Sequence, residues 1–282
     1  MEIKDMGGPE KNFKIRTLIL GVLILLLMFI PSVHAEEDDY DAEYDAEYEA
    51  LIELGKEVYN VRCEICHGSK GDGKGLVGVI RRSETSGRIQ VVHPWDFTRG
   101  VFRFRSTQSG CMPKDEDLLH IISNGIPISL MPSHKHIPLE ERKAIVEYLK
   151  TFSDYWEEAE EYEDEDECAP IKVQKPEWVG TTASVIRGKY IYEKMKCWEC
   201  HGHTGSGDGP KAAGLKDDWG RTMLPFDFTS GELKRGSTPE NVYVTFSTGL
   251  DGTGMPSYSD ALKEEERWHL VSYTLKLMEK KH

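Results

Sequence analysis

The chain has 282 residues, of which 39% are hydrophobic and 30% charged, and its formal net charge is −14. This length allows one or two domains with modest hydrophobic cores. A chain this acidic is not expected to bind nucleic acid, because the phosphate backbone selects basic surfaces.

Residues 1–35 are predicted to be an export signal. Lys11, Lys14 and Arg16 precede an apolar run from Leu18 to Ile30, and Val33-His34-Ala35 is typical of a cleavage site. The run is shorter than the ~20 residues that span a bilayer, which favours cleavage. An uncleaved membrane anchor is the alternative. We therefore expect a periplasmic or otherwise exported protein, with membrane anchoring left open.

Two later segments are strongly acidic. Nine carboxylates lie between Glu36 and Glu49, interleaved with tyrosine and alanine, and ten lie between Asp154 and Glu167. Such low-complexity stretches are not expected to bury a core. We expect residues 36–50 to be a disordered tail and residues 153–179 to be a linker. The linker is either a strap across both domains or a free tether.

Two copies of one motif lie in the two halves of the chain: Cys63-Glu64-Ile65-Cys66-His67 and Cys197-Trp198-Glu199-Cys200-His201. Two thiols at this spacing can bond both vinyl groups of a haem, and the histidine after them can ligate its iron. A redox dithiol or half of a zinc site would also use two such cysteines. The histidine, and the separation of 134 positions (197 minus 63) between the copies, favour two covalently bound haem c groups.

Each motif is followed by a methionine that is a candidate sixth ligand of the iron. Met131 and Met255 each lie six residues after a glycine, and each begins a Met-Pro-Ser sequence. A methionine ligand raises the reduction potential of haem iron. The repeated position favours ligation over a role as flexible core filler. His134 and His136 are the rival ligands in the first half; otherwise we expect them to be solvated loop residues.

The loops after the motifs repeat as well. Gly71-Asp72-Gly73 corresponds to Gly207-Asp208-Gly209, and Asp96-Phe97-Thr98 corresponds to Asp227-Phe228-Thr229. Agreement in the same order indicates an internal duplication. Helical patterns precede each motif and follow each methionine. We therefore expect one domain over residues 51–152 and a second over 180–282, each with the order helix, haem site, long loop, methionine, helix.

On these motifs, residues 50–152 and 180–280 resemble class I cytochrome c, used twice as in dihaem cytochromes c. The resemblance implies an all-α fold of two tandem class I cytochrome c domains joined by the acidic linker and preceded by the signal peptide. It also implies that a glycine and an aromatic residue of the first helix pack on an aliphatic and an aromatic residue of the last. The matching positions are Gly55 and Tyr59 with Ile145 and Tyr148, then Gly188 and Tyr192 with Leu270 and Tyr273.

The chain departs from the family in one respect. Family members usually place a proline about a dozen residues after the ligating histidine, and its carbonyl accepts the imidazole N–H. Pro210 is the expected partner of His201. The first domain has no proline after its motif until Pro94, which leaves the partner of His67 open and the two potentials free to differ.

Other residues support more limited expectations. Cys111 and Cys168 belong to neither motif, and a disulfide between them would remove two free thiols from an exported protein. Six arginines lie in loops expected at the haem edge, where some could pair with propionates. They are Arg81, Arg82, Arg103, Arg105, Arg221 and Arg235.

The expected function follows from the two protein ligands predicted for each haem iron. Histidine and methionine on each iron, His67 with Met131 and His201 with Met255, leave no open site for a substrate, which predicts an electron carrier and no enzyme. We expect an exported dihaem c-type cytochrome that passes single electrons between respiratory redox proteins, at least one with a basic docking surface. The alternatives are a haem c subunit of a membrane-bound oxidoreductase complex and a dihaem peroxidase.

Overall fold

The computed structural model describes residues 34–78, 80–83 and 89–279. Residues 1–50 and 51–282 form two separate units, so each is described by itself. The predicted export signal lies almost entirely outside the described residues. Within the described part of the chain, no helix has the length and apolar character needed to cross a membrane.

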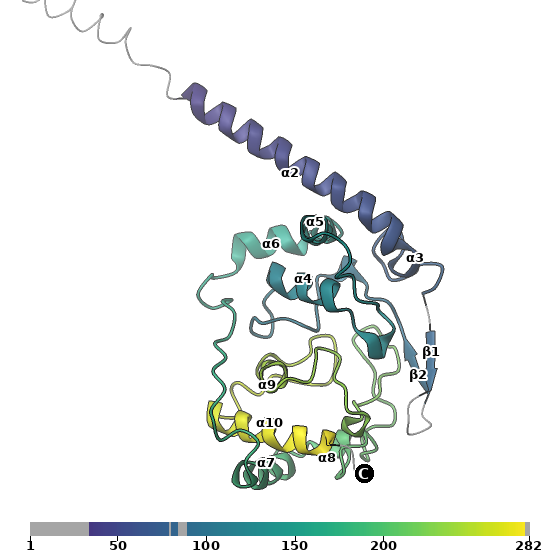
Figure 1. Cartoon of the computed structure of the whole chain (residues 1–282), viewed down its shortest axis with the longest axis vertical. Coiled ribbons are helices and arrows are strands. Elements are labelled where there is room, and N and C mark those ends of the chain that lie inside the picture. The colour runs from purple at the N-terminus through teal and green to yellow at the C-terminus, as the bar shows by residue number, and fades with distance from the viewer. Residues whose placement is uncertain (1–33, 79, 84–88, 280–282) are drawn as a thin grey trace, which may run out of the picture. The chain divides into compact units, whose positions relative to one another are not determined.

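Helices joined by long loops build both domains, as Figure 1 shows. In the first half the helices are α2 (His34–Arg62), α3 (Glu64–His67), α4 (Asp115–Asn124) and α5 (Leu139–Lys150), with the single 3-10 turns η1 (Phe97–Arg99) and η2 (Pro127–Ser129). The linker contains α6 (Tyr155–Tyr162). The second half has α7 (Thr182–Lys194), α8 (Trp198–His201), η3 (Phe228–Ser230), α9 (Pro239–Thr248) and α10 (Glu264–Met278).

The fold class agrees with the all-α expectation apart from one small hairpin. Strands β1 (Ile80–Ser83) and β2 (Ile89–Val92) pair antiparallel, with Ile80 opposite Val92 and Ser83 opposite Ile89. The hairpin lies in the long loop after the first motif. The corresponding loop of the second domain carries only an isolated bridge between Lys216 and Thr222.

Residues 36–50, expected to be a disordered tail, are helical. They lie inside α2, which continues without a break to Arg62. Alanine and glutamate have high helix propensity, and adding residues to an existing helix avoids the cost of nucleating a new one. Side chains 44–50 are exposed. The expectation of disorder was therefore wrong. The exposed side chains 44–50 agree with the expectation that this stretch buries no core.

Polar side chains fix the starts of α7 and α9. Thr181 accepts a hydrogen bond from Ser184 N at the start of α7, and Thr238 accepts one from Asn241 N at the start of α9. Each bond satisfies one of the backbone N–H groups that a helix leaves free at its first turn.

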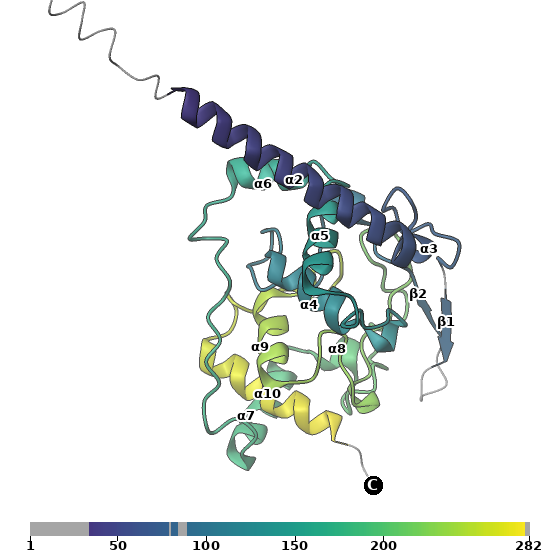
Figure 2. The same ribbon diagram turned by 45° about the horizontal axis from the view of Figure 1, so that its top comes forward.

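A close crossing of the first and last helices organises each domain. A Cβ atom on Gly188 of α7 would lie 2.0 Å from the carbonyl oxygen of His269 on α10, and one on Gly55 of α2 would lie 2.0 Å from that of Ala144 on α5. Only glycine allows this approach. Beside the glycines, the rings of Tyr59 and Tyr148 meet at 5.3 Å, and the equivalent pair in the second domain meets at 5.2 Å. The helix crossing implied by the resemblance is confirmed, and Figure 2 shows α7 beside α10.

The buried tyrosines tie this crossing to the motifs. Tyr59 and Tyr192 are at most 2% exposed. Their hydroxyls donate to the carbonyl oxygens of Gly68 and Gly202, each at 2.7 Å. Each of these glycines directly follows the motif histidine. The helix crossing therefore holds the end of each cysteine motif in place.

The acidic linker is fastened as a strap. A disulfide joins Cys111 of the first domain to Cys168 of the linker, which confirms the expected pairing. The Trp156 ring of α6 lies 5.5 Å from that of Phe102, and Ile171 N donates to Ser106 O. Glu163 also lies close to the two sulfur atoms, but both are bonded to each other and are not available to a metal ion.

Two arginines clasp the domains together from opposite sides. Arg105 of the first domain is fully buried, donates to Thr248 O at 2.8 Å and pairs with Asp251 at 2.9 Å. Arg235 of the second domain donates to Arg105 O at 2.5 Å and pairs with Asp117 at 3.1 Å. The fully buried guanidinium of Arg105 and the largely buried one of Arg235 each find a carboxylate in the other domain, which fixes how the domains meet.

An aromatic contact lies at the same boundary. The rings of Trp95 and Trp219 meet edge to face at 5.1 Å. The Arg103 guanidinium lies over both rings and pairs with Asp217 at 3.1 Å. Arg103, Arg105 and Arg235, considered above as partners of propionates, are thus used between the two domains.

Candidate functional site

Each cysteine motif forms a single helical turn. Cys66 N and His67 N both donate to Cys63 O, at 3.1 and 2.9 Å. Positions i, i+3 and i+4 of a helical turn lie on one face. The turn therefore presents both thiols and the imidazole to the same side. The second motif repeats these bonds from Cys200 N and His201 N to Cys197 O.

The four motif thiols are free, unlike Cys111 and Cys168. Burial raises the pKa of Cys63 to about 12 and that of Cys197 to about 11. A reactive dithiol of the redox type instead lowers the pKa of its attacking thiol to favour the thiolate. The buried environment of these thiols thus argues against disulfide exchange. It is compatible with cysteines that form a covalent bond to a cofactor.

Both motif histidines are oriented by a backbone carbonyl. Nδ1 of His67 lies 3.2 Å from Trp95 O, and Nδ1 of His201 lies 3.1 Å from Phe226 O. Since each carbonyl can only accept, Nδ1 carries the proton and Nε2 keeps its lone pair for a metal. Burial lowers the pKa of both imidazoles, which keeps them in the neutral form that binds iron.

These acceptors correct an expectation. Pro210 is not the partner of His201, and His67 does have a partner. The acceptor is in each domain the residue after a proline, in the matching sequences Pro94-Trp95-Asp96-Phe97 and Pro225-Phe226-Asp227-Phe228. The repeat was visible in the sequence, but only the fold shows which carbonyl faces the ring. The two domains therefore support their histidines in the same way.

A packed aromatic ring completes the support of each histidine. The ring of Phe97 stacks on His67 at 4.8 Å, and that of Phe228 stacks on His201 at 4.7 Å. Asp96 and Asp227 fix the turns that carry these rings, each accepting from the backbone N–H two residues later. The repeated Asp-Phe-Thr sequences are therefore part of the histidine environment.

The two methionines lie in equivalent tight turns. Met131 forms an isolated antiparallel bridge with Ile126, and Met255 forms one with Leu250. Three residues beyond Met255, the Tyr258 hydroxyl lies beside the Cys197 thiol, which brings this loop to the second motif. The position of each methionine in the fold is thus the same, as the repeated Met-Pro-Ser sequence predicted.

His134 differs from the expectation of a solvated loop residue. It is 8% exposed, and its Nδ1 has no hydrogen-bond partner among the described residues. Its position corresponds to that of Tyr258, since His134 N donates to Ile122 O as Tyr258 N donates to Phe246 O. The residue is buried because this position faces the interior of the domain. His136 is exposed, as expected.

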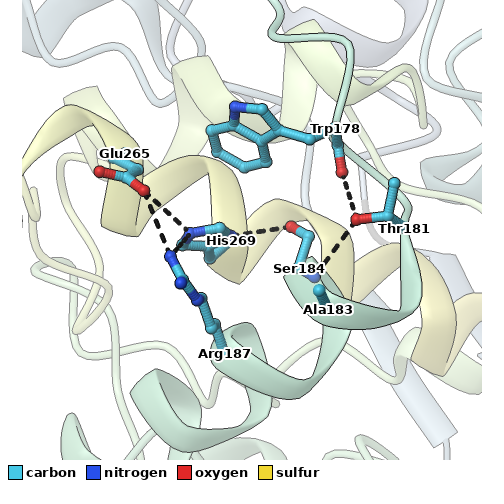
Figure 3. A pocket seen from close by; sticks show the side chains of 7 residues that line it. All are labelled: Trp178, Thr181, Ala183, Ser184, Arg187, Glu265 and His269. Carbon is cyan, nitrogen blue, oxygen red and sulfur yellow. Dashed lines mark hydrogen bonds and ion pairs between the residues drawn. The ribbon is translucent and has the colours of Figure 1, made fainter.

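A shallow pocket of about 170 Å³ lies at α7 and α10, away from the motifs, and Figure 3 shows its lining. Nδ1 of His269 lies 2.9 Å from the Ser184 hydroxyl, and Nε2 of the same ring lies 3.4 Å from the Glu265 carboxylate. Serine, histidine and glutamate are the residue types of a catalytic triad, but here the serine is not accessible to a substrate. Ser184 is 1% exposed and its hydroxyl donates to Ser272, so these groups join the two helices.

The donor set of the two motifs fits two haem c groups: paired thiols, a neutral imidazole with Nε2 free of described partners, and a methionine loop. When bound, haem c supplies a reversible one-electron couple at its iron. The cysteines would bond its vinyl groups, and His67 and His201 would ligate the iron.

Comparisons with known proteins agree with this donor set. Residues 185–277 match the family "Cytochrome c", and residues 50–149 match "Cytochrome C oxidase, cbb3-type, subunit III". No curated protein sequence matches the chain. A solved chain from the "Kuenenia stuttgartiensis reducing HAO-like protein complex Kustc0457/Kustc0458" is 41% identical, with a TM-score of 0.71. The match covers 80% of this chain and 96% of that one. This chain therefore belongs to the cytochrome c family, and it contains two such domains in tandem, whose chemistry is haem-based electron transfer.

Proposed function

We propose that this protein is an exported dihaem c-type cytochrome that transfers single electrons as the partner of a larger oxidoreductase complex. Cys63, Cys66, Cys197 and Cys200 bond the two haems, and His67 with Met131 and His201 with Met255 close the two irons. The observation that carries the proposal is the pair of histidines held identically by Trp95 O and Phe226 O. A ligand environment repeated this closely supports two centres of the same electron-transferring kind.

The clasp between the domains supports a role in which both centres work together. Arg105 and Arg235 each bond backbone and carboxylate groups of the opposite domain. Electron transfer depends on a fixed spacing between centres, and a buried clasp keeps that spacing constant. The protein can thus accept an electron at one domain and release it at the other.

A larger complex is supported by the similar solved chain, which comes from an HAO-like protein complex. The similarity to this solved chain is consistent with redox protein partners. We propose that these partners belong to a respiratory chain. Export is supported by the Cys111–Cys168 disulfide, because such bonds persist outside the reducing cytosol.

The acidic surface supports a partner with basic groups. On α6, the side chains of Glu157, Glu158, Glu160 and Glu161 are exposed. The strap holds this helix by Trp156 and the nearby disulfide. Fixed surface charge mainly accelerates encounter and is screened by salt. We expect the association rate with the partner to fall as ionic strength rises, and a rate independent of salt would contradict this steering role.

A redox titration followed by optical spectroscopy tests the main proposal. We expect two haems per chain in a pyridine assay, two one-electron steps, and the far-red sulfur-to-iron absorption in the oxidised protein. Fewer than two haems, or a high-spin centre that turns over peroxide, would contradict it.

A further inference from the structure

The two cysteine motifs have the same backbone but different surfaces. In the second domain, Lys211 N donates to Glu199 O, and the two side chains form an ion pair at 2.5 Å. In the first domain, Val77 N donates to Ile65 O in the same way. An ion pair in one domain is therefore replaced by two apolar side chains in the other, on an equivalent scaffold.

These apolar side chains are part of a larger exposed surface. Ile65 is 55% exposed, Val77 43%, Val61 73% and Leu76 96%. Val61 precedes the motif by two residues, Ile65 lies within it, and Val77, which follows Leu76, donates to the backbone of Ile65, so all four lie near Cys63–His67. We call these four residues the apolar face. Exposed apolar groups gathered at one place are typical of an interaction site.

The β1–β2 hairpin carries further exposed apolar side chains. Ile89 and Val91 of β2 are 63% and 39% exposed. Alternate residues of a strand point to the same side, so both lie on one face of the hairpin. Figures 1 and 2 both place the hairpin close to α3. The first domain thus adds an element after its motif that has no counterpart among the described residues of the second domain.

The fold does not require two members of the apolar face, Ile65 and Val77, to be apolar. Equivalent positions in the second domain hold Glu199 and Lys211 without loss of the turn. Domain packing does not cover it either, because the contacts between domains involve Trp95, Arg103 and Arg105. Ile65 and Val77 are therefore apolar at a surface where neither folding nor the clasp between the domains needs an apolar side chain.

Resting on the proposed function, we propose that the apolar face is the docking surface for the oxidoreductase partner, and that electrons enter or leave through the first domain. The occupant is a second redox protein of the HAO-like kind. Two observations point to this occupant. The similar solved chain is part of an HAO-like protein complex, and the face lies beside the cysteines that would hold the haem, where a partner must approach for electron transfer.

The charges near the apolar face indicate that the docked contact depends less on charge than the encounter that the acidic linker accelerates. Exposed Arg62 and Lys70 lie close to it in the chain, and exposed Glu57 lies one turn before Val61 on α2. Both signs are present, so the contact itself is apolar at its centre and polar at its rim. Salt therefore slows encounter through the acidic linker but leaves the docked complex largely intact.

The test uses the full-length holoprotein and a matched pair of double variants. Ile65→Glu with Val77→Lys reproduces the ion pair of the second domain on the same scaffold. The control, Ile186→Glu with Tyr190→Lys, places a Glu–Lys pair on α7, where Ile186 and Tyr190 are 65% and 69% exposed. The probe is the subunit that accompanies the matched chain in the Kuenenia stuttgartiensis complex, with Kd measured by surface plasmon resonance.

We expect the first double variant to weaken binding at least about tenfold, chiefly through faster dissociation, because apolar centres dominate such interfaces. Its haem spectrum, reduction potentials and denaturation midpoint should match those of the unmodified protein, and the control should bind normally. Binding within twofold of the unmodified protein would overturn the docking surface and leave the proposed function standing. A change in self-association instead would assign the face to a second copy and also overturn it. Failure of the unmodified holoprotein to bind or exchange electrons with the probe would overturn both proposals.

Discussion

Arg105 of the first domain donates through Nη2 to the carbonyl oxygen of Thr248 in the second domain, at 2.8 Å, from a side chain with no exposed surface. The same guanidinium donates to Gln108 O and Phe102 O within its own domain and pairs with Asp251 of the other. One buried cation therefore organises a loop of the first domain and holds the methionine loop of the second.

We expect Arg105→Met to lower the free energy of unfolding by about 3 kcal/mol, because it leaves buried carbonyls and a carboxylate without their donor. The measurement is denaturant unfolding of the holoprotein followed by circular dichroism. Lys143→Met is the control, since its ion pair with Glu140 is exposed and should contribute less than about 1 kcal/mol. Equal effects of the two changes would show that the clasp is not a stabilising feature.

The sixth ligand of the first iron can be tested by separate replacements. Met131→Ala should remove part of the sulfur-to-iron absorption and lower one reduction potential, because a thioether ligand is lost. His134→Ala should leave both quantities close to those of the unmodified protein. Met255→Ala is the matched change in the second domain. The opposite result in the first domain, with His134→Ala altering the spectrum and Met131→Ala silent, would assign the ligand to His134.

Gly188 is expected to be the least replaceable residue of the second helix crossing. A Cβ atom there would lie 2.0 Å from His269 O, so Gly188→Ala must push α7 and α10 apart. We expect a loss of about 3 kcal/mol in the free energy of unfolding. Gly254→Ala should be neutral, because no atom lies within 4 Å of its Cβ position. Thermal unfolding of both holoprotein variants checks this difference.

The buried tyrosines predict a loss of stability at alkaline pH. Burial raises the pKa of Tyr59 and Tyr192 above the usual value, so the folded protein keeps protons that the unfolded chain releases. Their contribution is complete below about pH 10 and falls as pH rises beyond that value. Replacing both by phenylalanine should reduce this alkaline loss, at a cost of about 1 kcal/mol per hydrogen bond near neutral pH. Urea midpoints from about pH 8 to about pH 11 would show it, and parallel curves for variant and unmodified protein would count against this account.

Local features of this protein could be predicted from its sequence. A cysteine pair followed by histidine places three donors on one face of a single turn, whatever the rest of the chain does. The duplication also located Met131 and Met255, and the positions of Gly55 and Gly188 matched a helix crossing that the structure confirms.

Only the tertiary structure decided the features that join distant segments. The partner of His67 is 28 residues away and that of His201 is 25, and the course of the intervening loops selects one carbonyl among many. His134 is buried and Arg105 is enclosed between two domains for the same reason: their surroundings come from segments far along the chain. Periodicity and spacing describe neighbours in sequence, whereas burial, the domain clasp and the exposed apolar face depend on which surfaces meet when the chain is packed.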